Sequence, residues 1–315
     1  MRVLVAGGAG FVGSHLVELL VERGDDVIVL DNMITGSPRN LAHLAPGRVS
    51  LVRGSAENAA DGAAIDRVYH LGSPASPEAY TRHQVATLMA NSEGTKRLLD
   101  IALRAGARFL LASTSEIYGD PLVHPQPETY WGNVDPIGPR SMYDEGKRFG
   151  EALVVAYVRE RGADARIVRI FNAYGPRMQL NDGRMPSEFI AAALQGAPLR
   201  VHGDGTQTRS LCYVGDTARG LIAAMERGEA GSAYNIGRAE EISVLDFARV
   251  VIRESGSDSL IHFVPGRPQD IHRRCPDTTK SERELGWVPE TPLSAGLRST
   301  ISWYREALYA PLAAG

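Results

Sequence analysis

A glycine-rich turn close to the amino terminus constrains the fold of this chain more than any other feature of its sequence. The apolar run Arg2–Ala6 predicts a short buried strand, and a turn with glycine at every third position follows it directly. Gly7 permits a tight turn, Gly10 lets the main chain approach a phosphate group, and Gly13 lets the next helix pack closely on the strand. The free N–H groups at the start of that helix, expected over 11–23, would bind a diphosphate.

An acidic residue at the end of the next strand indicates which dinucleotide this turn would bind. Asp31 closes the predicted strand 27–31, about 20 residues after the glycine turn. A carboxylate at this place can accept hydrogen bonds from both hydroxyl groups of the adenosine ribose. It would repel the 2′-phosphate of NADP, so the sequence predicts NAD as the cofactor.

Short apolar runs alternate with amphipathic stretches through the first half of the chain. Further strands are predicted at 49–53, 67–71, 107–113 and 166–171, and long helices at 11–23, 78–105 and 142–161. Strands that are apolar on both faces are typical of a parallel sheet covered by helices on both sides. We therefore predict an α/β fold with a Rossmann-like, doubly wound parallel sheet.

The pattern changes after Asn172, where glycine, proline and arginine become dense and shorter elements alternate irregularly. We expect residues 1–172 to form a domain that binds NAD, and residues 173–210 and 237–315 to form a smaller α/β lobe that binds the substrate. Residues 211–214 and 216–227 are expected to return to the main sheet, so that 211–236 belongs to the first domain. Ligands of open α/β sheets bind at the carboxyl ends of the strands, and the lobe would close over that edge.

Charge and cysteine content exclude several classes of protein. The 34 basic and 37 acidic residues leave a net charge of −3, which provides no basic field for nucleic acid. No apolar run reaches the roughly 18 residues of a membrane-spanning helix, and no signal peptide precedes the first strand. Cys212 and Cys275 lack the spacing of zinc ligands and are expected to be buried thiols. These features predict a cytoplasmic protein without a metal site.

Tyr143 and Lys147 are candidates for acid–base chemistry. Four residues apart in a predicted helix, they share one face, where the ammonium would stabilise a phenolate and lower the pKa of Tyr143. A phenolate can remove the proton of a hydroxyl group while a hydride leaves the same carbon. The run 113–116 (Ser-Thr-Ser-Glu) ends the fifth predicted strand, and its hydroxyl groups would hydrogen-bond the substrate at the same sheet edge.

These residues resemble the motifs of extended short-chain dehydrogenases/reductases that act on nucleotide sugars. Longer segments are similar to one branch of that superfamily, the UDP-glucuronate decarboxylases. They are 70–77 (His-Leu-Gly-Ser-Pro-Ala-Ser-Pro), 113–120, 130–132, 136–147, 171–178, 181–184 and 273–277. The resemblance covers the chain from Arg2 to about Tyr304. It implies oxidation of the sugar at C4, loss of CO2 from the resulting β-keto acid, and re-reduction at C4 to give UDP-xylose.

By resemblance, the catalytic residues are Tyr143, Lys147, Glu116, Ser115, Thr114 and Arg274. Tyr143 would be the base at C4, and Thr114 or Ser115 would bond the C4 oxygen. Glu116 and Arg274 would act around the substrate carboxylate and the protonation of C5. A guanidinium fork suits a carboxylate, because it binds both oxygens through parallel hydrogen bonds.

The resemblance also implies a set of binding residues. Those expected to hold NAD are Gly7, Gly10, Phe11, Val12, Gly13, Asp31, Asn32, Thr35, Gly36, Leu71, Ser73, Ser113, Tyr143 and Lys147. Those expected to hold UDP-glucuronate are Pro74, Tyr80, Asn91, Asn172, Arg184, Val201, His202, Arg209 and Arg274. Arg184 and Arg209 would neutralise the diphosphate, so that the smaller lobe becomes the part that binds the nucleotide sugar.

Other functions stay open at this stage. A 4-epimerase acting on UDP-glucuronate or another UDP-sugar shares the oxidation step but retains the carboxylate. A 4,6-dehydratase is disfavoured, because Ser115 stands where that family has an aspartate. A regulatory protein that only binds NAD or a nucleotide sugar would have no use for Tyr143, Lys147 and Glu116. In relatives the helices that correspond to 78–105 and 142–161 pair with those of a second copy, which predicts a homodimer.

Overall fold

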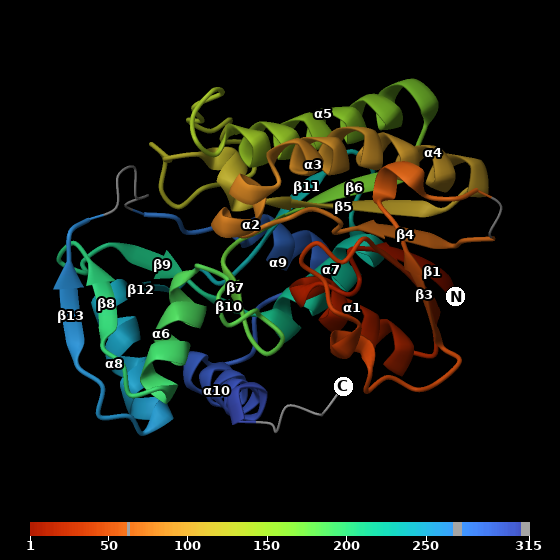
Figure 1. Cartoon of the computed structure of the whole chain (residues 1–315). Coiled ribbons are helices and arrows are strands. Elements are labelled where there is room, and N and C mark those ends of the chain that lie inside the picture. Colours follow the sequence, from red (N-terminus) through yellow and green to blue (C-terminus); the bar gives the residue numbers. More distant parts are fainter. Residues whose placement is uncertain (62–63, 267–272, 310–315) are drawn as a thin grey trace.

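The computed structural model describes residues 1–61, 64–266 and 273–309. Its centre is a parallel sheet of seven strands in the order β11-β6-β5-β4-β1-β2-β3. The strands are β1 Arg2–Ala6, β2 Asp26–Asp31, β3 Val49–Arg53, β4 Arg67–His70, β5 Arg108–Thr114, β6 Ala165–Ile170 and β11 Ala233–Ile236. The order reverses between β1 and β4, which confirms the predicted doubly wound arrangement (Figure 1).

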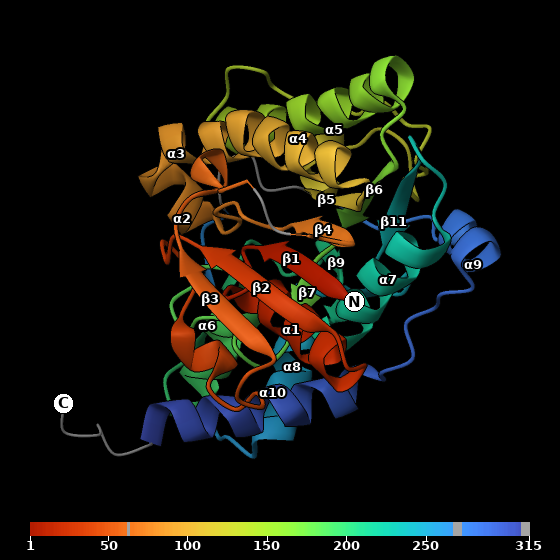
Figure 2. The ribbon, with the colours of Figure 1, turned by 90° about the vertical axis from the view of Figure 1, so that its right-hand side faces the viewer.

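One layer of helices covers each face of this sheet (Figures 1 and 2). One layer holds α4 (Thr95–Ala105) and α5 (Ser141–Arg161), and the other holds α1 (Phe11–Glu22) and α7 (Val214–Arg227). Side chains of β1 alternate between the layers, because Val3 and Val5 join the core of α1 and α7 while Leu4 joins that of α4 and α5. In the described part of the chain, no helix is both long and apolar enough to cross a lipid bilayer.

The predicted continuous helix 78–105 is wrong. α2 (Pro77–Arg82) ends at His83, where a ψ of 49° leaves the helical region, and α3 (Gln84–Met89) follows. A π-helical turn at Ala90–Gly94 then joins α3 to α4. Asn91 in this turn is fully buried, and its Nδ2 donates a hydrogen bond to Ser73 Oγ at 2.9 Å. Such a turn often marks a functional site, and hydrophobic periodicity does not reveal it.

The smaller lobe is built on α6, α8 and α10, whose apolar faces form a separate core. Its elements are α6 Met185–Leu194, β8 Leu199–His202, β9 Thr208–Ser210, β12 Glu241–Ser243, α8 Val244–Ser255, β13 Ile261–Val264 and α10 Leu293–Tyr309, with α9 Thr279–Leu285 between β13 and α10. β8 pairs with β13, and β9 pairs with β12. The predicted range 237–315 includes 267–272 and 310–315, which lie outside the described residues.

Residues 211–214 do not join the main sheet as predicted. β10 (Cys212–Tyr213) pairs instead with β7 (Ala173–Tyr174) in a separate two-stranded sheet. The edge of β6 that this segment would need is already occupied by β11. The following helix, α7, does pack against β5 and β6 of the main sheet.

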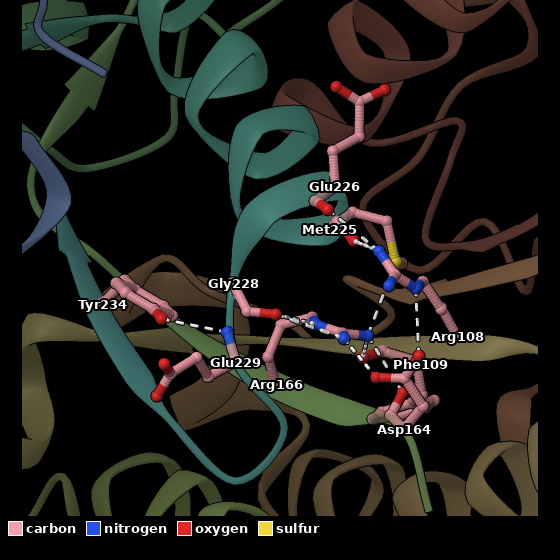
Figure 3. A network of polar contacts seen from close by, with 9 residues as sticks. All are labelled: Arg108, Phe109, Asp164, Arg166, Met225, Glu226, Gly228, Glu229 and Tyr234. Atoms are coloured by element: carbon pink, nitrogen blue, oxygen red, sulfur yellow. Dashed lines mark hydrogen bonds and ion pairs between the residues drawn. The ribbon is translucent and has the colours of Figure 1, made fainter. Parts of the chain in front are cut away.

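Two arginines at the amino-terminal ends of β5 and β6 donate hydrogen bonds to the end of α7 (Figure 3). Arg166 is 1% exposed, and it donates hydrogen bonds to the main-chain carbonyls of Gly228 and Phe109 at 3.3 Å. Arg108 donates to the carbonyls of Met225 and Glu226, at 3.2 and 2.9 Å. The last carbonyls of a helix have no partner within the helix, so these arginines satisfy groups that burial would otherwise make costly.

Candidate active site

The carboxyl ends of five central strands form the floor of an elongated cavity, here called the sheet-edge pocket. Its walls include Gly7, Gly10, Phe11, Val12, Gly13, Asp31, Asn32, Thr35, Leu71, Ser73, Pro74, Ser113–Glu116, Tyr143, Lys147, Asn172, Arg177 and Arg184. A second cavity, the lobe pocket, is lined by Glu116, Arg140, Asn172, Arg184, His202, Arg209 and Arg274. The two cavities share Glu116, Asn172 and Arg184, so a long ligand can extend from the sheet into the smaller lobe.

The glycine turn has the shape that a diphosphate requires. Gly7 has φ +79°, and a Cβ there would lie 2.6 Å from the main-chain carbonyl of Leu71. A Cβ on Gly13 would lie 2.0 Å from the carbonyl oxygen of Gly7. α1 starts at Phe11 without a side-chain cap, so the N–H groups of its first turn remain available at the pocket wall. The residues present therefore fit a bound dinucleotide.

Asp31 is held at the end of β2 by main-chain N–H groups. Its Oδ2 accepts a hydrogen bond from Ala9 at 3.0 Å, and its Oδ1 accepts one from Met33 at 2.9 Å. Burial raises its pKa, and these two bonds oppose that rise. Each carboxylate oxygen keeps a free lone pair for a ribose hydroxyl. Gly36 does not line the pocket, but a Cβ there would lie 2.7 Å from Asp31 Oδ1, so it gives the carboxylate room.

Tyr143 and Lys147 lie on the first turns of α5 and face the sheet-edge pocket. Lys147 Nζ donates a hydrogen bond to the carbonyl of Ala112 at 2.7 Å and lies 5.9 Å from the centroid of the Tyr143 ring. Burial lowers the pKa of Lys147 to about 7. Burial and the nearby Glu116 raise the pKa of Tyr143, against a hydrogen bond from Thr114. The predicted lowering of the Tyr143 pKa is therefore not seen, because burial and Glu116 outweigh the hydrogen bond from Thr114.

The three hydroxyl groups at the end of β5 point to different partners. Ser113 Oγ donates a hydrogen bond to Glu151 Oε1 at 2.5 Å, and Glu151 forms an ion pair with Arg169. The Ser113 hydroxyl is therefore used within the protein and holds the end of β5 in place. Thr114 bonds Tyr143 and also accepts the main-chain N–H of Glu116 at 3.2 Å. Ser115 is 2% exposed and lines the pocket. Thr114 and Ser115 are therefore the hydroxyls placed to meet a substrate oxygen beside Tyr143.

Several predicted substrate residues lie behind the cavity walls. Tyr80 stacks on Tyr143, with ring centroids 4.9 Å apart and planes 11° apart, and its hydroxyl accepts a hydrogen bond from Arg140 Nε at 3.0 Å. Asn91 is buried under Ser73 and lines none of the described cavities. Val201 is fully buried in the core of the smaller lobe. These side chains position the walls, and none of them lines the described pockets.

Two guanidinium groups flank the Glu116 carboxylate. Arg274 Nη1 lies 4.0 Å from Glu116 Oε1, and Arg140 Nη1 lies 3.9 Å from Oε2. Arg274 is 5% exposed and donates through Nη2 to the carbonyl of Gly119 at 3.0 Å, while its Nε is buried without a partner. A buried guanidinium N–H that lacks an acceptor is costly, so this donor is available to an acceptor on a ligand. Arg140 was not predicted as a site residue, although it lies within the 136–147 segment.

The lobe pocket gathers groups suited to a diphosphate. Arg184 pairs with Asp182 and lies over the Phe11 ring at 5.8 Å, and Asn172 Nδ2 is buried without a partner. Arg209 lines the same cavity from β9. Arg177 was also not predicted as a site residue. It lines the sheet-edge pocket, and its Nη1 is buried without a hydrogen-bond partner. Its position in the 171–178 segment, which resembles the decarboxylases, was the sequence feature that could have identified it.

His202 lies at the entrance to this region. It ends β8, lines the lobe pocket, and its Nδ1 contacts the carbonyl of Pro265 at 3.0 Å. This main-chain contact holds the ring at the cavity wall, as expected for a residue that packs on a ligand rather than one that transfers protons.

One group of potential metal ligands occurs among the described residues, formed by His124, Glu241 and Cys275. Both oxygens of Glu241 already accept hydrogen bonds from Arg273, at 3.0 and 2.7 Å. The Cys275 thiol donates to the carbonyl of Ala239 at 3.1 Å, and burial raises its pKa to about 11. A cation would have to displace Arg273 and deprotonate this thiol, so the group is a polar contact between segments.

Comparisons with known proteins agree with this geometry. Residues 3–237 match the model of the NAD dependent epimerase/dehydratase family. UDP-glucuronic acid decarboxylase 1 of Arabidopsis thaliana is 48% identical over 98% of this chain and 71% of its own length. UDP-glucose 4-epimerase of Thermotoga maritima, solved with UDP-glucose, has a TM-score of 0.88 and 30% identity over 98% of this chain and 100% of its own. A dTDP-glucose 4,6-dehydratase of Streptomyces venezuelae, solved with NAD bound, has a TM-score of 0.87 and 32% identity over 99% of this chain and 100% of its own.

Proposed function

The chain belongs to the NAD dependent epimerase/dehydratase family, and from this membership we propose that it is an NAD-dependent carboxy-lyase that converts UDP-glucuronate to UDP-xylose and CO2. The observation that carries the proposal is its likeness, over nearly the whole chain, to a plant UDP-glucuronic acid decarboxylase. Arg274 supports it from the structure, because its buried, unpartnered Nε offers a donor for a substrate carboxylate.

NAD is the cofactor, and it supplies a reversible hydride acceptor for C4, so that the overall reaction is redox-neutral. The first turn of α1 and Gly7, Gly10 and Gly13 would hold its diphosphate. Asp31 would accept the hydroxyl groups of the adenosine ribose through the free lone pairs of its two oxygens.

The chemistry at C4 belongs to Tyr143, Thr114 and Ser115. Tyr143 would take the proton of the C4 hydroxyl and return it when C4 is reduced again. Lys147 would favour the phenolate in its charged form, which it populates below a pH of about 7. Thr114 already bonds Tyr143, so it can stabilise oxygen charge at the place where that charge develops.

Loss of CO2 follows from the C4 ketone. A β-keto acid breaks its bond to the carboxylate readily, because the electron pair left at C5 spreads onto the C4 oxygen as an enolate. Thr114 and Ser115 would stabilise that oxygen, while Arg274 would orient the carboxylate through its unpartnered Nε. Glu116, between Arg274 and Arg140, lies where a proton must reach C5.

The nucleotide part of the substrate would lie in the smaller lobe. Arg184, Arg209 and Asn172 supply cationic and amide donors for the diphosphate, and His202 lines the outer end of the lobe pocket. In this proposal residues 1–172 and 211–236 bind NAD, and residues 173–210 and 237–315 bind the nucleotide sugar.

We also propose a homodimer in which α3 and α5 pair with the same helices of a second copy. These helices pack side by side on the outside of the sheet (Figure 1). Val85, Leu88 and Met89 on α3 are 73%, 40% and 40% exposed, and Phe149 on α5 is 52% exposed. Exposed apolar side chains on neighbouring helices are typical of an interface. The unpaired, buried thiols of Cys212 and Cys275 support the proposed cytoplasmic location.

Incubation of the purified protein with UDP-glucuronate, without added NAD, tests the proposal. Proton NMR should show UDP-xylose, with stoichiometric release of CO2. UDP-galacturonate without CO2 would replace the proposal with a 4-epimerase, a function that the likeness to UDP-glucose 4-epimerase makes the second candidate. Absence of turnover after NAD is added would refute UDP-glucuronate as the substrate.

A further inference from the structure

A second carboxyl group lies next to Glu116 and has no place in the chemistry described so far. Asp144 follows Tyr143 on the first turn of α5 and is 7% exposed. Its side chain forms a hydrogen bond with that of Glu116, and Asp144 Oδ1 and Glu116 Oε2 are buried without any donor from the rest of the protein. A hydrogen bond between two carboxyl groups requires a proton on one of them. The pair therefore holds a proton in a buried place.

The charged groups around Asp144 come from every element packed on it. Glu116 follows β5, Tyr80 lies on α2, and Arg140 and Arg274 face the pair from the start of α5 and from the segment before α9. Burial and Glu116 together raise the pKa of Asp144 to about 8, while the two arginines oppose this rise. Two nearby carboxyl groups cannot both be charged cheaply, so the shared proton persists at neutral pH.

The two carboxyl groups line different cavities. Glu116 lines the sheet-edge pocket and the lobe pocket. Asp144 instead lines a third cavity of about 910 Å3, the outer cavity, whose walls include Asp120, Asn133 and Asp135. These three residues are exposed, so the outer cavity opens to solvent. The lobe pocket and the outer cavity meet at Arg140 and Arg274, so the pair lies between the substrate region and solvent.

The proposed reaction needs such a connection. The proton that Tyr143 takes from the C4 hydroxyl returns to the same oxygen, so this transfer consumes no net proton. Loss of CO2 breaks the C5–C6 bond and leaves the electron pair as an enolate, and C5 then forms a new C–H bond. The proton in that bond leaves with UDP-xylose, so each turnover consumes one proton from solvent.

We propose that Asp144 and Glu116 act as a proton relay, in which Glu116 gives the shared proton to C5 and Asp144 takes up its replacement from solvent through the outer cavity. This inference rests on the proposed decarboxylase function. It makes Asp144 a positioning and proton-supplying residue, since it reaches the reacting carbon only through Glu116.

The Asp144→Asn variant, loaded with NAD, tests the relay in a single turnover with UDP-glucuronate. The amide keeps a hydrogen bond to Glu116 but cannot pass a proton on. We expect oxidation at C4 and release of CO2 at rates close to those of the unchanged protein, and a slowing of C5 protonation by about 100-fold. Absorbance of reduced cofactor should accumulate together with the enolate, and after an acid quench, which protonates C5 in solution, a UDP-4-keto-pentose should appear by NMR.

The pH profile supplies a readout that a purely structural role would not move. In the unchanged protein the protonation step should slow above a pH of about 8, where the pair loses its proton. Asp144→Asn should abolish this decline. The matched control Asp120→Asn changes an exposed carboxylate on the wall of the same outer cavity and should leave rate and profile unchanged.

The possible failures are distinguishable. Formation of UDP-xylose by the unchanged protein, together with a normal protonation rate and pH profile in Asp144→Asn, would overturn the relay alone. An equal slowing of oxidation and protonation would make Asp144 a structural residue only. Absence of UDP-xylose from the unchanged protein would overturn both proposals. If Asp144→Asn does not fold, Asp144→Ser, which leaves space for a water molecule, should show the same accumulation of reduced cofactor.

Discussion

Lys147 and Tyr143 form a pair in which burial drives both side chains toward their neutral forms. Lys147 Nζ lies 5.9 Å from the centroid of the Tyr143 ring and donates a hydrogen bond to the carbonyl of Ala112. Burial lowers the pKa of Lys147 to about 7 and raises that of Tyr143. The resting phenol therefore keeps its proton, while a pKa of about 7 lets Lys147 gain or lose a proton near neutral pH at little cost.

Replacing Tyr143 with phenylalanine should remove the base at C4. We expect kcat to fall by about 100- to 10,000-fold, which is the usual contribution of a positioned general base. NAD affinity, measured by fluorescence titration, should stay within a few-fold, since the ring and its stacking on Tyr80 are kept. A kcat within tenfold of the unchanged protein would assign the base to another residue.

Lys147 should cost stability in a pH-dependent way. Its pKa is about 7 in the folded protein and about 10.4 when unfolded, so the unfolded state binds more protons between these values. Stability therefore rises with pH across this window, and the full cost of burial applies below pH 7. Lys147→Met should remove this slope and raise the free energy of unfolding at pH 6 by about 1–3 kcal/mol, measured by urea titration, while activity falls. An unchanged slope would contradict the assignment.

His15 should make the protein sensitive to acid. It lies on α1 with Nε2 2.9 Å from the carbonyl of Pro176, and burial lowers its pKa to about 4. The unfolded state, with a pKa of about 6.5, binds more protons between these values, so stability falls as pH drops from about 6.5 to 4. His15→Gln should flatten this part of the profile in thermal unfolding. His262→Gln, on an exposed position of β13, is the control and should leave the slope as it is.

Arg166 should contribute to stability far from the cavities. Its guanidinium, 1% exposed, satisfies main-chain carbonyls of Gly228 and Phe109 (Figure 3). Arg166→Met keeps the apolar volume but removes the side-chain donors to the Gly228 carbonyl, which should cost about 2–4 kcal/mol in the free energy of unfolding. Arg298→Met removes an ion pair to Glu254 from a side chain that is 61% exposed, and should cost less than about 1 kcal/mol. Equal losses would show that the carbonyl contacts contribute nothing.

Local patterns were enough to predict the sheet and the dinucleotide turn. Strands such as Arg2–Ala6 are apolar on both faces, and the positions of Gly7 and Gly13 follow from steric limits that the structure shows. The break at His83 was not predictable from periodicity, because the buried residues Tyr80 of α2 and Thr87 of α3 are seven positions apart, as they would be on one face of a continuous helix.

Contacts between distant segments escaped the sequence for a different reason. The stacking of Tyr80 on Tyr143 and the approach of Asp144 to Glu116 depend on how α2, α5 and the end of β5 meet in space. The spacing of residues within one element does not predict contacts between different elements. The same holds for the pKa of Tyr143, where the four-residue spacing from Lys147 was visible but the desolvation that outweighs it was not.

Arg274 should distinguish a carboxylated sugar from the nucleotide that carries it. Its Nη2 is committed to the carbonyl of Gly119, and its buried Nε is the donor left for a ligand. Arg274→Lys keeps the positive charge but loses the Nε donor, so it should weaken UDP-glucuronate binding by about 10- to 100-fold, the value of one charged hydrogen bond. Binding of UDP, which has no carboxylate, should change by less than about threefold, because Arg184 and Arg209 lie elsewhere in the lobe pocket. Isothermal titration of both ligands measures the difference, and an equal loss for both would move Arg274 from the carboxylate to the diphosphate.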